Sequence, residues 1–209
     1  MTGLRERQKA DRSRRILEAA LRLFRDEGYG AVRIEDIAEA AEVSAGTCYN
    51  YFSTKGDILL AIVSMEVEEV VEAGRAIVLA PPSEVAEALD QLIRIYYDHS
   101  LYYLSKEMWR TAMALTIEAP ETPFSQRYGQ LDEMLAQQVA QLIAAMQARG
   151  LTRPDVRPDV MGLVVFNNLN QLFTEFVRQE EMPIAALHRQ SRAMTDLLAR
   201  LMADDGPAV

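Results

Sequence analysis

Residues 34–55 (IEDIAEAAEVSAGTCYNYFSTK) constrain the fold of this chain more than any other stretch. The apolar residues at its start recur at helical spacing and give a short helix one apolar face: Ile34, Ile37, Ala38 and Ala41. A turn follows, in which the Ser44 hydroxyl can cap a second helix by accepting from the backbone N–H of Gly46 or Thr47. The pattern predicts two short helices joined by a tight turn.

The second helix, residues 45–52, has two chemically different faces at 100° per residue. Its inner face is small and apolar: Ala45, Cys48 and Phe52. Its outer face carries a glycine that lets the backbone come close to a ligand, an amide, a hydroxyl and a phenol: Gly46, Asn50, Thr47 and Tyr49. Such a face suits the major groove of DNA, because Asn50 can pair with an adenine edge while Thr47 and Tyr49 donate to phosphates. Lys55 adds a charge for a further phosphate.

This region resembles the TetR family of one-component transcriptional regulators over about the first quarter of the chain. The matching stretches are ILEAALRLFRDEGYGAV, IEDIAEAAEVS and GTCYNYFSTKGDIL, with a Thr-x-Tyr-x-Tyr-Phe core. By resemblance, the family's usual DNA contacts fall on Thr47, Tyr49, Asn50, Tyr51 and Lys55. The complete set expected at the DNA adds four residues: Arg33, Ser44, Ala45 and Gly46.

Four positions depart from the family pattern: Arg33 replaces a capping Thr, Glu42 replaces Gly, Cys48 replaces Leu and Gly56 replaces Glu. Arg33 could contact a phosphate, whereas Glu42 would be strained if the turn needs a positive φ there. No departure removes a group that DNA binding needs. The structural alternative is a helical hairpin in an ordinary α-helical domain.

Composition excludes several other classes. No apolar run approaches the ~20 residues that span a bilayer, and the basic N-terminus has no apolar stretch after it, so we expect a cytoplasmic protein without membrane contact. Cys48 is the single cysteine, and with only His99 and His188 the sequence predicts no metal site and no cofactor. A nucleophile with a base and a glycine-rich phosphate loop are both missing, so no enzyme is predicted. Cys48 is expected to pack inside the recognition helix rather than sense redox state.

The net charge of −9 is distributed unevenly. Residues 1–55 hold ten Lys and Arg against nine Asp and Glu, which leaves twelve against twenty-two for the remainder. Basic residues crowd the first fifteen positions: Arg5, Arg7, Lys9, Arg12, Arg14 and Arg15. The sequence indicates a flexible basic arm that either orders on DNA or stays a solvated tail.

The rest of the chain has the apolar periodicity of helices. They are expected at about residues 11–27, 56–79, 84–104, 124–149, 159–180 and 183–202, with breaks at proline-rich segments. This predicts an all-α protein with an N-terminal three-helix helix-turn-helix domain (residues 1–55). A long helix joins it to a C-terminal helical domain for ligand binding and dimerisation (56–209).

Tyrosines and the single tryptophan crowd the stretch YYDHSLYYLSKEMWRTAM, which is either plain core or the wall of a ligand cavity. The candidate ligand-binding residues mix large apolar surface with a few polar groups: Tyr103, Trp109, Met113, Thr116, Phe166, Asn170 and Phe173. They predict a mostly apolar small-molecule effector with one or two hydrogen-bonding groups.

The last two predicted helices carry an apolar seam that could form a four-helix bundle with a second copy of the chain. The expected dimer residues are Phe166, Leu169, Phe173, Val177, Ile184, Leu187, Ser191, Met194, Leu198 and Leu201. Packing within one subunit is the alternative, whereas the family resemblance favours the dimer.

The leading hypothesis is a homodimeric repressor that a small molecule releases from a pseudo-palindromic DNA operator. An activator on the same scaffold would have the same features. The competing hypothesis is a helical dimer that binds a small molecule or a partner protein without specific DNA binding; the acidic remainder and Glu42 support it.

Overall fold

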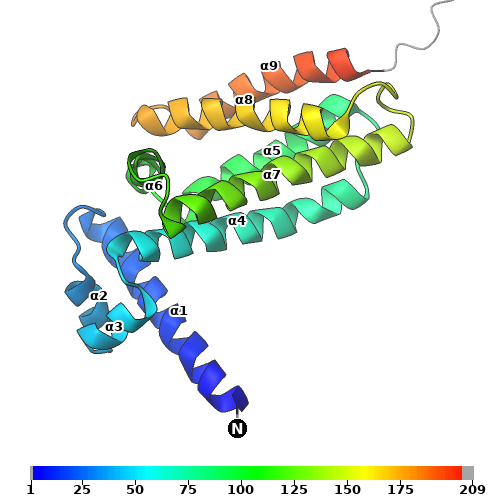
Figure 1. Cartoon of the computed structure of the whole chain (residues 1–209). Coiled ribbons are helices and arrows are strands. Elements are labelled where there is room, and N and C mark those ends of the chain that lie inside the picture. The colour runs from blue at the N-terminus through cyan, green and yellow to red at the C-terminus, as the bar shows by residue number, and fades with distance from the viewer. Residues whose placement is uncertain (1, 204–209) are drawn as a thin grey trace, which may run out of the picture. The chain divides into compact units, whose positions relative to one another are not determined.

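The computed structural model describes residues 2–203, without the side chains of residues 2, 4 and 5. This part of the chain forms nine helices and no strand, which confirms the all-α prediction. The helices are α1 (Thr2–Glu27), α2 (Ile34–Ala40), α3 (Ala45–Tyr51), α4 (Lys55–Leu79), α5 (Val85–Tyr103), α6 (Lys106–Glu118), α7 (Pro123–Ala148), α8 (Pro158–Arg178) and α9 (Ile184–Met202) (Figure 1).

The structure divides the chain into two compact units in a way that differs from the expected boundary at residue 55. Unit 1 comprises Met1–Met65 and Tyr103–Tyr128, and unit 2 comprises Glu66–Tyr102 and Gly129–Val209. Helix α6 therefore belongs with the N-terminal helices. Helices α4 and α7 each continue through a boundary between the units.

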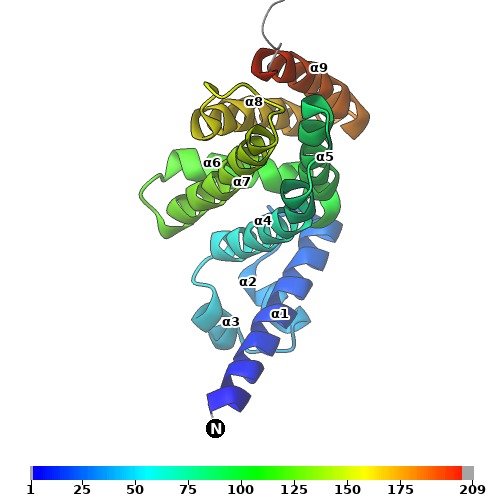
Figure 2. The ribbon, with the colours of Figure 1, turned by 90° about the vertical axis from the view of Figure 1, so that its right-hand side faces the viewer.

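In unit 1, α2 packs on both α1 and α3 (Figure 2). The shared core is apolar and closed to solvent: Ile16, Ala20, Phe24, Ile37, Ala38, Cys48, Ile58 and Leu59. Helix α1 ends before Gly28, which has a φ of +85°. Helix α6 begins at an N-cap that sequence reasoning missed: Ser105 accepts from the Met108 N–H at 3.2 Å.

Helix α1 starts much earlier than expected. Its first turns are helical from Thr2, so residues 2–10 continue the helix in place of a flexible arm. The reason is local: no glycine or proline interrupts residues 4–27. Arg14 also pairs with Asp11 at 2.8 Å and Glu18 at 2.7 Å on the same helix face. Arg5, one of the basic residues of the expected arm, is not among the residues whose side chains the structure describes.

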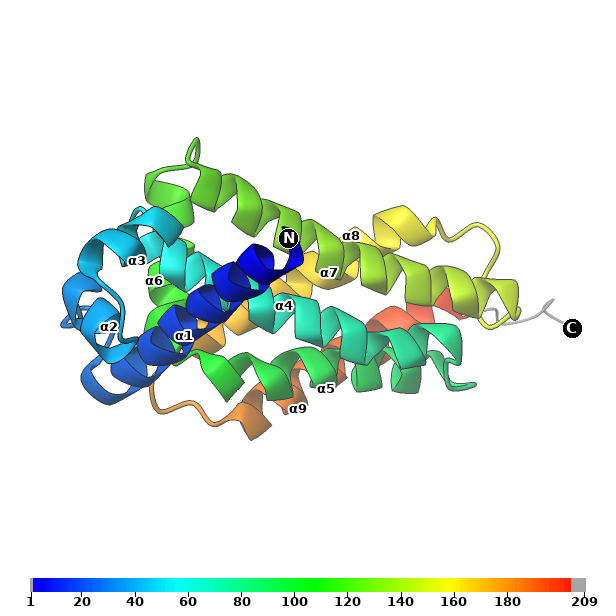
Figure 3. The same ribbon diagram turned by 90° about the horizontal axis from the view of Figure 1, so that it is seen from below.

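In unit 2, α4 and α7 run in the same direction and α8 runs the opposite way (Figures 1 and 3). The Gln138 side chain ties α7 to its neighbours, since Nε2 donates to the Val71 carbonyl at 2.6 Å and Oε1 accepts from the Tyr96 hydroxyl at 2.8 Å. Helices α7 and α8 nearly touch at Gly162, where an added Cβ would lie 2.7 Å from the Cβ of Ala140. These contacts fix the register of the bundle.

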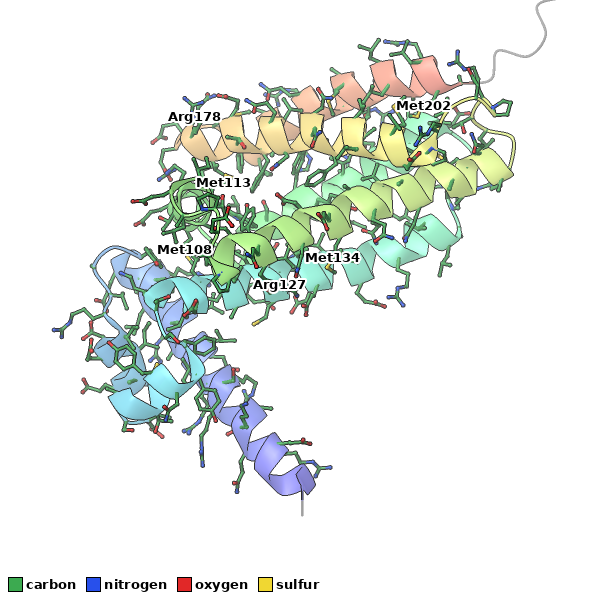
Figure 4. The ribbon with its side chains drawn as sticks, viewed as in Figure 1. Met108, Met113, Arg127, Met134, Arg178 and Met202 are labelled. Carbon is green, nitrogen blue, oxygen red and sulfur yellow. The ribbon has the colours of Figure 1, made fainter. Side chains whose placement is uncertain are left out.

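Helices α8 and α9 lie side by side (Figure 1). Figure 4 places Arg178, at the end of α8, and Met202, at the end of α9, at opposite ends of this pair. The N–H of Arg153 donates to the Met202 carbonyl at 2.9 Å, which holds the segment before α8 against the end of α9. The start of α8 and the end of α9 therefore share one end of the pair.

Candidate functional site

The turn between α2 and α3 has the predicted capping geometry. Ser44 is the N-cap of α3, and its Oγ accepts from the Thr47 N–H at 3.0 Å and contacts the Thr47 hydroxyl at 2.8 Å. Glu42 has a φ of 55°, the left-handed conformation that sequence reasoning expected to be strained in a non-glycine residue. Its carboxylate lies 3.8 Å from Arg15 on α1.

Helix α3 presents its polar face to solvent. Gly46, Tyr49 and Asn50 are exposed, with 44% of Tyr49 accessible, whereas Cys48 is fully buried. Nothing lies within 4 Å of the Cβ that Gly46 lacks, so a DNA backbone could approach it there. The remaining predicted members on this helix, Ala45, Thr47 and Tyr51, are partly exposed.

Two predicted DNA contacts are engaged within unit 1. The Tyr49 hydroxyl donates to Glu35 Oε1 at 3.0 Å, and this hydrogen bond raises the pKa of the phenol. The guanidinium of Arg33 bonds Asp36 at 3.0 Å, and the same carboxylate accepts from the Arg33 backbone N–H at 2.8 Å. Arg33 therefore supports the start of α2, and a phosphate would have to compete with Asp36 for it.

Lys55, predicted as a phosphate contact, is engaged within unit 1. Its Nζ donates to the carbonyls of Tyr29 at 2.6 Å and Val32 at 2.9 Å and lies 4.3 Å from the centre of the Tyr29 ring. Burial lowers the pKa of the amine. The ammonium holds the loop between α1 and α2, and sequence spacing gave no sign of this because the partners lie more than 20 residues away.

The expected ligand-binding residues fall into both units. Tyr103, Trp109, Met113 and Thr116 lie in unit 1, and the Thr116 hydroxyl bonds the Met113 carbonyl at 2.7 Å within α6. The α8 members, Phe166, Asn170 and Phe173, lie in unit 2. The seven-residue pocket stays a prediction.

Unit 2 contains an aromatic contact and two acidic side chains that sequence reasoning missed. Tyr97 stacks on Phe173 with ring centres 6.0 Å apart and donates its hydroxyl to the Leu169 carbonyl at 2.9 Å. Glu66 is 2% exposed, and Asp132 is half-buried; burial raises the pKa of each carboxyl to about 7. The signal was present, because Glu66 stands in the apolar stripe of Ile62, Val63, Val67 and Val70.

The apolar seam predicted for dimerisation packs mainly inside the chain. Seven of its ten residues are buried: Phe166, Leu169, Phe173, Val177, Leu187, Ser191 and Leu198. Ile184 and Met194 are half-buried, and Leu201 is 55% exposed. These seven residues are covered within the single chain, and their role in a dimer stays a prediction, because periodicity marks an apolar helix face without showing which neighbour covers it.

Other apolar residues of α8 and α9 are exposed in the single chain. They lie at the shared end of the pair: Val160, Leu163, Val164, Leu197 and Leu201. Asn167, Asn168 and Gln171 continue the exposed side of α8. We call Val160, Leu163, Val164, Leu197 and Leu201 the exposed apolar face.

Residues 2–203 contain neither a candidate metal site nor a helix suited to span a membrane. Within that range no group of three or more His, Cys, Asp or Glu residues could hold a metal ion. No helix there combines the length and apolarity needed to cross a bilayer. Burial raises the pKa of the Cys48 thiol, which makes it less reactive.

Comparisons with known proteins agree with this geometry. Residues 16–62 match the family model described as bacterial regulatory proteins, tetR family. The HTH-type transcriptional repressor KstR of Rhodococcus jostii (strain RHA1) is 38% identical over 65 residues, which are 31% of this chain and 31% of that protein. The chain thus matches less than a third of this relative's length.

Solved structures resemble the whole fold. Thermus thermophilus FadR, a TetR-family transcriptional repressor in complex with lauroyl-CoA, has a TM-score of 0.69 at 22% identity, covering 94% of this chain and 98% of that one. A chain from Saccharomonospora viridis in complex with choline has a TM-score of 0.65 at 22% identity, covering 92% and 97%. Residues 16–62 thus carry the N-terminal domain that this tetR family model describes, and the chain is similar in fold to these two solved structures.

The turn at Glu42 allows a stability test. We expect Glu42→Gly to raise the free energy of unfolding by up to about 1 kcal/mol, since relief of left-handed strain outweighs the added freedom of the unfolded chain. The matched control is Glu39→Gly within α2, expected to cost about 1 kcal/mol. Urea denaturation measures both. Destabilisation by Glu42→Gly would show that Glu42 makes a contact worth more than the strain.

The role of Lys55 allows a second test. We expect Lys55→Met to lower the free energy of unfolding by about 1 to 2 kcal/mol, because loop carbonyls lose their charged donor. DNA affinity should fall without a change in the slope of its logarithm against the logarithm of salt concentration. A phosphate contact predicts the reverse, a stable protein whose slope falls by about one. Lys9→Met, on the exposed part of α1, is the control for stability.

Proposed function

We propose that this protein is a ligand-responsive, homodimeric DNA-binding transcriptional regulator that acts in the cytoplasm. The observation that carries the proposal is the exposed polar face of α3 behind a turn capped by Ser44. Asn50 would read an adenine edge in the major groove, while Thr47 and Tyr49 bond the phosphates beside it. The tetR-family match of residues 16–62 supports this interpretation.

The exposed apolar face supports dimerisation. Its α8 and α9 side chains are 40 to 55% exposed in the single chain, and an apolar face of this kind in a water-exposed bundle indicates a protein partner. Two chains paired through this face by a two-fold axis would present two α3 helices to DNA. If these helices lie about 34 Å apart, they can read successive turns of a pseudo-palindromic operator.

Ligand response would pass through helices shared by both units. Helix α4 follows directly on the DNA-binding helices and continues from unit 1 into unit 2, as does α7. An effector that binds unit 2 more tightly in the form unsuited to the operator lowers DNA affinity by the same difference in binding free energy. The simplest outcome is a repressor released by its effector, as the name of the relative KstR suggests.

The two similar structures described above hold chemically different small molecules, an acyl-coenzyme A and a quaternary ammonium compound. A mostly apolar effector, as predicted from the α8 residues, is compatible with the stacked rings of Tyr97 and Phe173 in unit 2.

A binding titration tests DNA recognition. We expect the protein to bind a DNA fragment from upstream of its own gene, and Asn50→Ala to weaken this specific binding by about 1 to 3 kcal/mol while non-specific binding is unchanged. Fluorescence anisotropy at several salt concentrations measures both. The control is Gln126→Ala, an amide exposed at the start of α7.

Two results would contradict the proposal. The first is equal affinity of wild type and Asn50→Ala for every fragment. The second is the absence of specific binding by a folded dimer, which would favour the competing function, a dimeric small-molecule or partner-binding protein without specific DNA binding.

A further inference from the structure

The interior of unit 2 contains a carboxyl group that is only half satisfied. Glu66 is 2% exposed, and its Oε1 lies 2.9 Å from His99 Nδ1. Its second oxygen, Oε2, is fully buried and has no hydrogen-bond partner within the described residues. Because buried polar atoms are nearly always paired, an orphaned carboxyl oxygen indicates that a group is missing from the site.

Within the described part of the chain, no lysine or arginine is among the groups that shift the pKa of Glu66. The charged groups that act on it are His99, on α5, and Glu69, one turn along α4. The other ring nitrogen of His99 lies 3.5 Å from Glu69, so the imidazole is shared between two carboxylates. The Tyr102 ring lies against the imidazole at 5.3 Å. The charged groups that act on Glu66 are therefore one histidine and one acid.

A second carboxyl, that of the half-buried Asp132, lies on α7. Asp132 precedes Gln138 by six residues, and Glu66 precedes Val71, the partner of Gln138, by five. Because α4 and α7 run in the same direction, the two acids lie at similar heights along their helices, and neither contributes to the pKa of the other. Burial alone raises the pKa of Asp132, with no charged side chain contributing.

Helix α8 contributes to the same cross-section. Asp132 lies eight residues before Ala140, and Asn170 lies eight residues after Gly162, the glycine that meets Ala140. Since α7 and α8 run in opposite directions, Asp132 and Asn170 share one level. The neighbouring Leu169 carbonyl accepts from Tyr97, whose ring stacks on Phe173. Asp132, Asn170 and the aromatic pair thus lie near one level of α5, α7 and α8.

We propose that the effector of this regulator carries a positively charged group, a protonated amine or quaternary ammonium, which binds Glu66 inside unit 2. The apolar part of the effector packs on the aromatic pair formed by Tyr97 and Phe173. A cation would pair with the carboxyl oxygen that the chain leaves without a partner. This inference rests on the proposed function, because it names the chemistry of the effector.

The test compares three probes that share one apolar chain: decyltrimethylammonium, decanol and decanoate, each below its micelle concentration. Calorimetry on DNA-free protein measures their affinities. We expect the cation to bind at least about tenfold more tightly than the other two. Glu66→Gln should remove this preference while leaving decanol affinity within about threefold. The control is Glu72→Gln, the same change at an exposed position of α4, which should keep the preference.

A proton readout separates recognition from a purely structural role. The pKa of Glu66 is about 7, so a bound cation should ionise the carboxyl and release a proton near neutral pH. Calorimetry in two buffers with different ionisation enthalpies measures that release. It should be absent in Glu66→Gln.

Each of three results would overturn the inference: equal or tighter binding of decanol or decanoate, an unchanged cation preference in Glu66→Gln, or no binding of any probe. None of these measurements involves DNA. If the protein binds its operator while every probe fails, the inference fails and the proposed function stands. If the cation binds as expected but no specific DNA binding occurs, the proposed function fails.

Discussion

Replacing both Leu163 and Leu197 with arginine is expected to convert the dimer into a folded monomer. Each leucine is 52% exposed in the single chain, so the charges cost the monomer little. In a dimer the charges would be buried without partners in the exposed apolar face. Operator affinity should fall about 100-fold or more, because binding of one DNA-binding domain would no longer raise the effective concentration of a second one at the neighbouring half-site. Sedimentation velocity measures the mass and anisotropy measures the affinity.

The matched control is Leu79→Arg, at an exposed leucine that ends α4 and lies outside α8 and α9. It should leave both mass and affinity unchanged. A Leu163→Arg/Leu197→Arg protein that still sediments as a dimer would show that the chains associate through another surface. A wild-type monomer would remove the dimer altogether.

Glu66→Gln is expected to stabilise the protein in a pH-dependent way. Because the pKa of Glu66 is raised to about 7, wild type keeps its full stability below the unfolded pKa and loses it as pH rises through the folded value. Between about pH 5.5 and about pH 8 the loss is about 2 kcal/mol. A glutamine side chain cannot ionise, so the substitution should remove this loss and preserve the contact with His99.

Urea denaturation at the two pH values measures the difference between the proteins. Glu72→Gln again serves as the exposed control and should follow wild type at both. The account of Glu66 as a buried acid without a cation would be contradicted by a stability difference that does not grow with pH. Destabilisation at high pH would mean that the ionised carboxylate is well paired.

The exposed polar face of α3 could be predicted because its determinants are local. Helix periodicity separated Cys48 from Asn50, and the side chain of Ser44 indicated the capped turn within three residues of its partner. The strain at Glu42 likewise follows from a tight turn that needs a positive φ. Helix ends elsewhere were predicted to within one or two residues wherever proline or glycine marks them, as at Pro123 and Pro158.

The remaining features depend on contacts between distant residues. Lys55 was predicted to face DNA but bonds loop carbonyls 23 and 26 residues away. The seam of α8 and α9 was assigned to a partner, although Val177 and Leu187 are completely buried within the chain. Periodicity reports that a face is apolar and leaves its neighbour unspecified. Glu66 was overlooked, although its position within an apolar stripe was visible in the sequence.

Selection of bound sequences from a random duplex library most directly tests the central claim that two α3 helices read DNA together. The account predicts enrichment of one site made of two inverted half-sites whose centres lie about one helical turn, 10 to 10.5 base pairs, or a multiple of it apart. Asn50→Ala should lose the preference at one position in each half-site. Enrichment of a single half-site, or of no sequence at all, would contradict the account.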